Sequence, residues 1–207
     1  MTPPIRSKSP STAPVDAIDT RSRILQAAQR LFRKRGYHAT GLNDILELAQ
    51  APKGSMYHHF PGGKEEIGVC VIENITAGLL GLFAQSRERT TQGMVAKVGE
   101  QLVIVAEKTQ FEICALYSAF VAERKTSPLL GQSVATAYGQ MLDALQARMV
   151  QDGLSKRIAK EKSQMAVALL EGGSLLAQAR QDASLFRAAV KQAAQICAAD
   201  PSWRQSA

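Results

Sequence analysis

One short segment decides the fold: residues 40–60, with the sequence TGLNDILELAQAPKGSMYHHF. Thr40 can cap a first helix, whose apolar positions then share one face: Leu42, Ile45, Leu46 and Ala49. Gln50-Ala51-Pro52 breaks that helix, and a proline suits the start of the next because it lacks an N–H that would be unpaired there. In residues 53–60, Met56 and Phe60 lie four apart and can anchor one face. The segment therefore predicts two short helices joined by a tight turn.

The opposite face of the second helix is polar and carries lysine, serine, tyrosine and histidine. Two short helices with such a polar outer face form a helix-turn-helix, which places its second helix in the major groove of DNA. Lysine, serine and tyrosine donate to phosphates, and Gly54 would let the backbone approach the sugar-phosphate closely. The alternative is an ordinary helical hairpin with exposed polar residues.

A longer helix is predicted before this pair, over residues 20–35. Asp19 and Thr20 offer its N-cap, and Gly36 supplies the stop. Its apolar residues recur at helical spacing: Ile24, Ala28, Leu31 and Phe32. After the pair, Pro61-Gly62-Gly63 ends the second short helix, and a long helix is expected from residue 64 to about 89. Residues 1–18, rich in proline, serine and threonine, are expected to be a disordered tail.

The basic charge of the chain is concentrated around this motif. The 207 residues carry a net charge of +7, with 25 Lys/Arg against 18 Asp/Glu. Residues 1–64 hold ten of the basic residues and four of the acids, a net charge of +6, whereas residues 65–207 carry +1. A compact basic segment on a near-neutral body is typical of a nucleic-acid-binding protein. By charge alone, a solvated basic face with a cationic tail explains the sequence equally well.

The motif resembles the DNA-binding domain of TetR-family transcriptional repressors over residues 19–80. The resemblance is carried by the runs at 40–46, 52–60 and 63–67, and the Phe-Pro-Gly-Gly-Lys-Glu-Glu variant at 60–66 is similar to the LmrA/YxaF branch. Residues 169–180, LLEGGSLLAQAR, are similar to that branch's C-terminal region. Two positions depart from the family pattern. Gln50 stands where the family usually has glycine, and a left-handed Gln50 would cost roughly 1–2 kcal/mol. Pro52 replaces the common serine cap.

The resemblance implies roles for individual residues. It implies that five side chains contact phosphates: Thr40, Ser55, Tyr57, His59 and Lys64. It implies that Lys53 and His58 lie at or near base edges and that Phe60 packs inward. Together with Gly54, these residues form the candidate DNA-binding set, and the expected partner is double-stranded DNA with a near-palindromic operator.

The rest of the chain is predicted to be helical, so the fold class is all-α. Residues 15–51, 62–127 and 129–200 contain no proline and are rich in good helix formers. Residues 65–200 would form about six further helices, with breaks at 127–128, 151–153 and 181–183. We therefore expect an N-terminal three-helix helix-turn-helix domain over residues 19–79 and a C-terminal helical bundle over residues 80–200.

The resemblance implies that this bundle binds a small-molecule effector and dimerises. The pocket candidates are aromatic and sulfur-containing residues: Phe83, Met94, Phe111, Cys114, Tyr117, Phe120, Tyr138, Met141 and Met149. For each, ordinary core packing is the alternative, although a buried tyrosine hydroxyl at 117 or 138 requires a partner. The last two helices, about 156–181 and 183–198, are the expected homodimer surface. Its candidate residues are Met165, Leu169, Gly172, Gly173, Leu176, Leu185, Ala189 and Ile196. Paired glycines inside a helix would allow close approach across a two-fold axis, or would mark a kink.

Other classes of protein fit less well. His58 and His59 are adjacent and so cannot chelate one metal ion as an i, i+4 pair does, and Gly63-Lys64 lacks the remainder of a P-loop. We expect no metal, no cofactor, no catalytic triad and therefore no enzyme. The three cysteines are too few and scattered for a disulfide framework, no apolar run approaches a membrane span, and no signal peptide is evident, so a cytoplasmic location is expected. The sequence predicts a ligand-responsive repressor; the alternative is a helical ligand carrier or interaction module whose basic end is incidental.

Overall fold

The computed structural model describes residues 19–114 and 117–199, and these form helices and connections without a β-strand. The expected disordered tail, residues 1–18, lies outside the described residues. In chain order the elements are α1 (Thr20–Arg35), α2 (Leu42–Ala49), α3 (Lys53–His59), α4 (Gly63–Gln85), α5 (Thr91–Lys108), α6 (Ser118–Val121), the 3₁₀ helix η1 (Ala122–Lys125), α7 (Pro128–Gln151), α8 (Lys156–Arg180) and α9 (Ala183–Ile196). The all-α prediction is confirmed.

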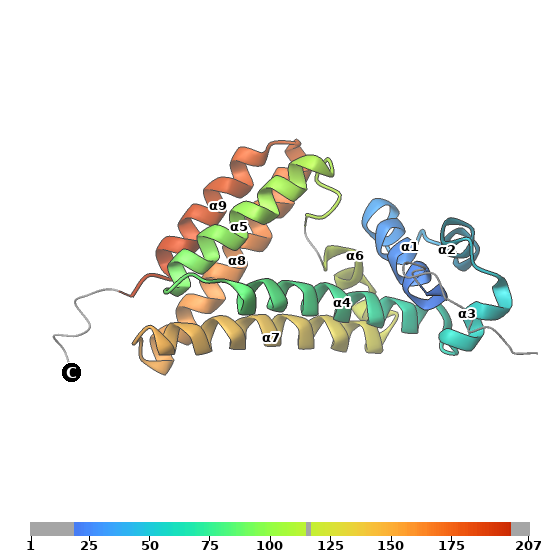
Figure 1. Cartoon of the computed structure of the whole chain (residues 1–207), viewed down its shortest axis with the longest axis horizontal. Helices are drawn as coiled ribbons and strands as arrows, with labels where there is room; N and C mark the ends of the chain where they lie inside the picture. Colours follow the sequence, from blue (N-terminus) through green and yellow to red (C-terminus); the bar gives the residue numbers. More distant parts are fainter. Residues whose placement is uncertain (1–18, 115–116, 200–207) are drawn as a thin grey trace, which may run out of the picture.

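The helices form two groups joined by α4. Figure 1 shows α1, α2 and α3 at one end, α5, α8 and α9 at the other, and α4 running beside α7 between them. Glu65 near the start of α4 accepts a hydrogen bond from Ser127, the N-cap residue of α7, which fastens these two helices together. The predicted boundary between residues 79 and 80 falls inside the continuous α4, so the division into domains stays a prediction.

Local signals in the sequence position the first three helices. Asp19 caps α1 by accepting a hydrogen bond from the backbone N–H of Ser22 at 2.8 Å, and Gly36 ends the helix at a φ of 80°. A φ of this sign favours glycine because it has no β-carbon to clash. Both predictions for this helix are confirmed. Ile24, Phe32 and their apolar neighbours are buried against α2, α3 and α4.

Two predicted helix ends were wrong. Thr40 does not cap α2: Gly41 occupies the N-cap position and its N–H donates to the Asp44 carboxylate at 3.3 Å, which starts the helix one residue later. The long fourth helix ends at Gln85 rather than near residue 89. The reason is that Thr90 caps α5 by accepting from the N–H of Gly93 at 3.1 Å, so residues 86–90 form a connection.

Helix α4 is apolar enough to be compared with a membrane span. Its 23 residues include an 18-residue window with mean hydropathy 1.8, so by length and composition alone it could cross a bilayer. A few charged and polar residues interrupt the apolar run, so the sequence pattern alone did not indicate a membrane span. In this fold α4 packs against both α1 and α7, and 33% of that window is buried within the chain.

The turn between α2 and α3 carries a strained residue. Gln50 adopts φ 50° and ψ 44°, the left-handed conformation that the sequence analysis considered. We therefore expect Gln50→Gly to raise the free energy of unfolding by about 0.5–1 kcal/mol, because glycine adopts this conformation without a steric penalty. Urea denaturation of the full chain measures the change. Gln26→Gly, at an exposed position inside α1, is the control and should lower stability by about 1 kcal/mol. Equal destabilisation by both changes would contradict the assignment of strain to Gln50.

Candidate functional site

Helix α3 presents a polar face that is open to solvent. Met56 and Phe60 are 1% and 0% exposed and anchor the helix on the core, as predicted. On the other side Lys53, Tyr57 and His58 are exposed, and Ser55 and His59 are partly exposed. In the described part of the chain no atom would come within 4 Å of a β-carbon built on Gly54, so the backbone itself is accessible there. A polar, accessible helix of this kind suits a DNA groove.

The N-terminus of α1 holds the end of α3 in place. The guanidinium group of Arg21 lies 5.1 Å from the centroid of the Phe60 ring, and its Nη2 donates to Sγ of Cys70 at 3.5 Å. A cation over an aromatic face is attracted by the ring quadrupole. The pKa of Asp19 is lowered, chiefly by the hydrogen bond from Ser22 and also by His59 at the end of α3. These contacts connect the start of α1 to the end of α3 and to α4.

The rings of the two histidines on α3 pack against each other. The rings of His58 and His59 are 5.1 Å apart in an edge-to-face arrangement. Within residues 19–114 and 117–199, no group of three or more His, Cys, Asp or Glu side chains is placed to hold a metal ion. This part of the site offers hydrogen-bond donors and acceptors to a polar partner.

Thr40 is not available to a phosphate, contrary to the implied role. It is 1% exposed, and its hydroxyl donates to the carbonyl of Gly36 at 2.8 Å. The hydroxyl thus satisfies a carbonyl at the end of α1, which would otherwise lack a partner. Thr40 therefore stabilises the connection between α1 and α2.

Lys64 also has a structural role, and its implied phosphate contact stays a prediction. Its Nζ donates to the carbonyl oxygens of Tyr37 at 3.1 Å and of Thr40 at 3.0 Å. The same ammonium group lies 4.4 Å from the centroid of the Tyr37 ring. Desolvation lowers the pKa of Lys64, and burial raises the pKa of Tyr37 to about 12. Lys64 therefore ties the start of α4 to the connection between α1 and α2.

We expect Lys64→Ala to lower the free energy of unfolding by about 1–3 kcal/mol, because two carbonyl groups lose a charged donor. Thermal unfolding of the full chain in the absence of DNA measures this. Lys34→Ala, which removes an exposed lysine from α1, is the matched control and should change stability by less than about 0.5 kcal/mol. A Lys64→Ala variant as stable as the control would contradict the structural role.

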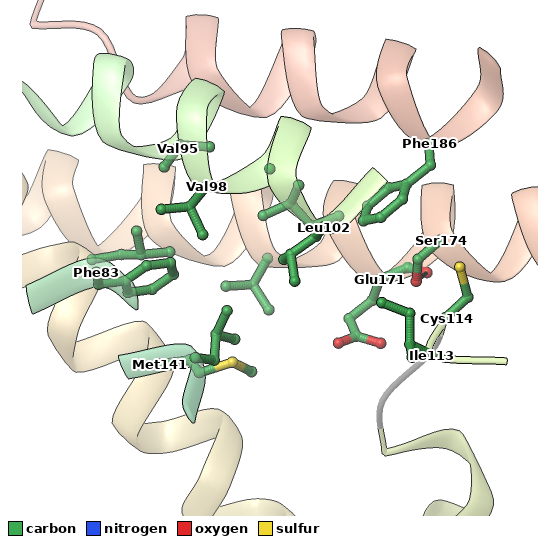
Figure 2. Close-up of a pocket in the computed structure, with 15 residues that line it drawn as sticks. Phe83, Val95, Val98, Leu102, Ile113, Cys114, Met141, Glu171, Ser174 and Phe186 are labelled. Carbon is green, nitrogen blue, oxygen red and sulfur yellow. Dashed lines mark hydrogen bonds between the residues drawn. The ribbon is translucent and has the colours of Figure 1, made fainter. Parts of the chain in front are cut away.

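An apolar cavity of about 70 Å³ lies in the C-terminal group of helices. Its walls come from α4, α5, α7, α8, α9 and the segment after α5, as Figure 2 shows. Three of the predicted pocket residues line it: Phe83, Cys114 and Met141. The other lining residues are Leu79, Val95, Val98, Gly99, Leu102, Ile113, Leu145, Val167, Leu170, Glu171, Ser174 and Phe186.

The remaining pocket candidates belong to the core. Met94, Met149, Phe111 and Phe120 are buried in hydrophobic clusters and are not among the residues that line the cavity. Tyr117 is 0% exposed, and its hydroxyl shares a hydrogen bond of 2.8 Å with Oγ1 of Thr76. Tyr138 packs edge to face on Tyr117, with the ring centroids 5.0 Å apart. The prediction that both hydroxyls need partners holds, although neither tyrosine lines the cavity.

Sequence reasoning missed Glu171 on α8, the carboxylic acid among the described residues that line the cavity. It shares a hydrogen bond with Tyr138, and burial raises its pKa. The sequence does hold a signal for it. Val167, Leu170 and Ser174 lie four residues before, one before and three after Glu171, so they share one side of α8, and an acid is unexpected among mostly apolar residues there. Acidic residues are rarely buried without a reason.

The candidate dimer residues divide into two groups. On α8, Met165 and Leu176 are each 55% exposed, Gly172 is exposed and Leu169 is partly exposed, so these four form one accessible face. Gly173 instead packs inside the chain: a β-carbon built on it would lie 2.2 Å from Cβ of Ala189. The close helix approach that the glycines predicted is therefore between α8 and α9 of the same chain. Leu185 and Ile196 on α9 are partly buried, and Leu185 packs on an internal cluster.

Comparison with known proteins identifies both parts of the chain. Residues 24–67 match the family model "Bacterial regulatory proteins, tetR family", and residues 90–192 match "Transcriptional regulator LmrA/YxaF-like, C-terminal domain". The chain is 34% identical over 165 residues to the HTH-type transcriptional regulator LmrA of Bacillus subtilis, across 76% of this chain and 86% of the relative. The regulator YxaF of the same organism is 31% identical over 176 residues, across 79% of this chain and 87% of the relative.

Solved structures share the fold. A TetR transcriptional regulator from Legionella pneumophila superimposes with a TM-score of 0.79 at 20% identity, over 89% of this chain and 100% of that one. Reduced NemR from Escherichia coli superimposes with a TM-score of 0.72 at 22% identity, over 88% of this chain and 100% of that one. Since both Bacillus relatives also align over most of their length, this chain belongs to the TetR family of DNA-binding transcriptional regulators, with an LmrA/YxaF-like C-terminal domain.

Proposed function

We propose that this regulator is a homodimeric repressor that a small molecule releases from a near-palindromic operator. The α3 helices would read the operator, the cavity would take the effector, and the accessible face of α8 would form the dimer. The protein would act in the cytoplasm, without catalysis and without a cofactor. The observation that carries the proposal is that α4 reaches both sites: its Lys64 holds the connection between α1 and α2, and its Leu79 and Phe83 line the cavity.

The size of the cavity supports a mechanism of release. A volume of about 70 Å³ is smaller than the roughly 150 Å³ that accommodates benzene in an engineered protein cavity. A larger effector would have to push the cavity walls apart, and α4 is one of those walls. Because the core resists compression, displacement at Leu79 and Phe83 would move the whole helix rather than be absorbed locally. The start of α4 would then shift the helix-turn-helix through Lys64.

The direction of this effect depends on affinity for two states of the dimer. An effector that bound the DNA-competent and DNA-incompetent states equally would shift nothing. In the proposed mechanism the narrow cavity belongs to the DNA-competent state. An effector that needs a wider cavity therefore binds the DNA-incompetent state more tightly. Two recognition helices must lie about 34 Å apart to enter successive major grooves, so a small rotation of each subunit is enough to prevent simultaneous binding.

The proposal is tested on DNA selected from random duplexes by the full-length protein. We expect a near-palindromic site whose affinity falls steeply as salt increases, because lysine and arginine side chains displace counterions from phosphates. Tyr57→Ala should weaken binding to that site at least 10-fold, since each dimer loses two phosphate contacts of about 1 kcal/mol. Fluorescence anisotropy over a salt series measures both effects.

Two variants serve as controls for this experiment. Tyr57→Phe keeps the ring and loses only the hydroxyl, so it separates hydrogen bonding from packing. Lys156→Ala removes an exposed cation from the start of α8 and should leave affinity and salt dependence unchanged. Equal retention of scrambled duplexes, or full affinity of Tyr57→Ala, would contradict the proposed recognition surface.

A further inference from the structure

Among the described residues that line the cavity, Glu171 is the ionisable acid in an otherwise largely apolar wall. The cavity lining is made of aliphatic and aromatic side chains together with Gly99, Cys114, Ser174 and Glu171. The hydroxyl of Ser174 donates to the backbone carbonyl of Glu171 at 3.0 Å, a bond within α8. The Glu171 side chain projects from α8 among the lining residues, near Ile113 and Cys114 in Figure 2. A carboxyl group in such surroundings determines which molecules the cavity can accept.

The surroundings satisfy this carboxyl group only in part. The hydroxyl of Tyr138, on α7, shares a hydrogen bond with it. Among the residues that the structure describes, no lysine, arginine or histidine forms an ion pair with Glu171. A buried carboxylate without a counter-ion is costly, so desolvation favours the protonated form and raises the pKa of Glu171.

We propose that the cavity takes an apolar molecule that carries a protonated amine, with the Glu171 carboxylate as its counter-ion. This inference rests on the proposed function of the cavity as the effector site. An ammonium group supplies the positive charge that the cavity lacks, and its N–H donates a charge-assisted hydrogen bond to a carboxylate oxygen. Tyr138 can continue to donate to the other oxygen, while the aliphatic and aromatic walls bury the rest of the molecule.

Binding of such an amine releases a proton. In the empty cavity, burial shifts Glu171 toward its protonated form; a protonated carboxyl group would lose its proton to solvent as the ammonium ion enters and forms the ion pair. The affinity for the amine therefore falls as pH decreases through the pKa of Glu171. The other titratable groups that interact with it are Tyr117, Tyr138 on α7 and Cys114 before α6; burial raises the pKa of both tyrosines and brings that of Cys114 to about 11. The lining residues of α4, α5 and α9 are not ionisable.

The test compares three probes with the same ring system: naphthylmethylamine, naphthylmethanol and ethylnaphthalene. Isothermal titration calorimetry with the full-length dimer measures their affinities. We expect the amine to bind at least 10-fold more tightly than the alcohol, since hydrogen bonds between charged groups are much stronger than neutral ones. Titration in buffers of different ionisation enthalpy should show proton release for the amine and none for the alcohol.

Matched variants assign the preference to Glu171. Glu171→Gln keeps the size and a hydrogen-bonding oxygen but loses the charge; amine affinity should fall at least 10-fold, with alcohol affinity unchanged within about 2-fold. Glu161→Gln changes an exposed glutamate two to three turns earlier on α8 and should change neither affinity. Val167→Phe adds a ring to the cavity wall and should weaken the binding of all three probes. That loss of affinity would show that the probes bind in the cavity.

The outcomes separate this inference from the function on which it rests. If amine and alcohol bind equally, or if Glu171→Gln retains full amine affinity, the assignment of the ligand class is wrong while the cavity remains a ligand site. If none of the probes binds, or if Val167→Phe affects none of them, both the ligand class and the effector site are contradicted. Proton release and amine selectivity that disappear together in Glu171→Gln would establish the ion pair.

Discussion

Replacing Gly173 with alanine is expected to lower the free energy of unfolding by about 2–3 kcal/mol. A β-carbon at this position would lie 2.2 Å from Cβ of Ala189, 3.7 Å from Cα of Ala189 and 3.5 Å from the carbonyl oxygen of Leu185. These atoms belong to the backbone of α9 or are rigidly attached to it, so no side chain can rotate away. The two helices would have to separate, and the contacts that Phe186 and Val190 make with their neighbours would loosen.

Two further variants isolate this contact, and urea denaturation measures all of them. Gly78→Ala changes an exposed glycine inside α4, where no described atom would lie within 4 Å of the new methyl group, and should raise stability by about 1 kcal/mol. The double variant Gly173→Ala/Ala189→Gly moves the methyl group from one helix to the other and should recover most of the lost stability. Destabilisation that the double variant fails to relieve would show that the Gly173–Ala189 contact is not its cause.

The contact between Gly173 and Ala189 shows which part of the helix packing could be predicted from the sequence and which part could not. Adjacent glycines within a helix were predicted to allow close approach across a two-fold axis or to mark a kink, since a glycine there costs stability unless it allows close approach. A helix does pass close by, but it belongs to the same chain. The glycines did not identify which helix, because the pattern of one helix does not specify its partner. In the fold, Gly173 faces α9 of the same chain, whereas Gly172, about 100° further round α8, is exposed.

Features that depend on neighbouring residues were the most predictable. The capping of α1 by Asp19, its end at Gly36, and the anchoring of α3 by Met56 and Phe60 all follow from short-range patterns. These interactions join residues within a few positions of each other, so the sequence displays both partners together. The same reasoning located the break at residues 50–52, while the left-handed conformation of Gln50 was considered only because the resembled family usually has glycine there.

Roles that depend on distant partners were predicted less well. Lys64 carries a donor that suits a phosphate, but the fold directs it to two carbonyl groups more than twenty residues away. Glu171 was missed because only the folded chain places its carboxyl group inside a cavity built from five helices. Residue chemistry limits what a side chain can do, while the tertiary fold determines which of those roles is used.

The last expected result concerns the dimer: Leu176→Glu should weaken self-association at least 100-fold. The accessible face of α8 carries Met165 and Leu176, each 55% exposed, and Leu175, 51% exposed, near the exposed Gly172. Such an apolar stripe is typical of a protein interface. In a symmetric dimer the substitution would place two carboxylates in the same interface, where desolvation and mutual repulsion both oppose binding.

Loss of the dimer should also reduce operator affinity by a factor of about 10²–10⁴, because the two α3 helices would no longer bind as one unit. Analytical ultracentrifugation measures the assembly, and fluorescence anisotropy measures DNA binding. Leu129→Glu is the matched control, since Leu129 is a similarly exposed leucine, 50% accessible, on α7. It should remain dimeric with normal affinity. If Leu176→Glu behaves like this control, the α8 face is not the dimer surface. If it becomes monomeric yet retains full operator affinity, the two recognition helices do not need to act together.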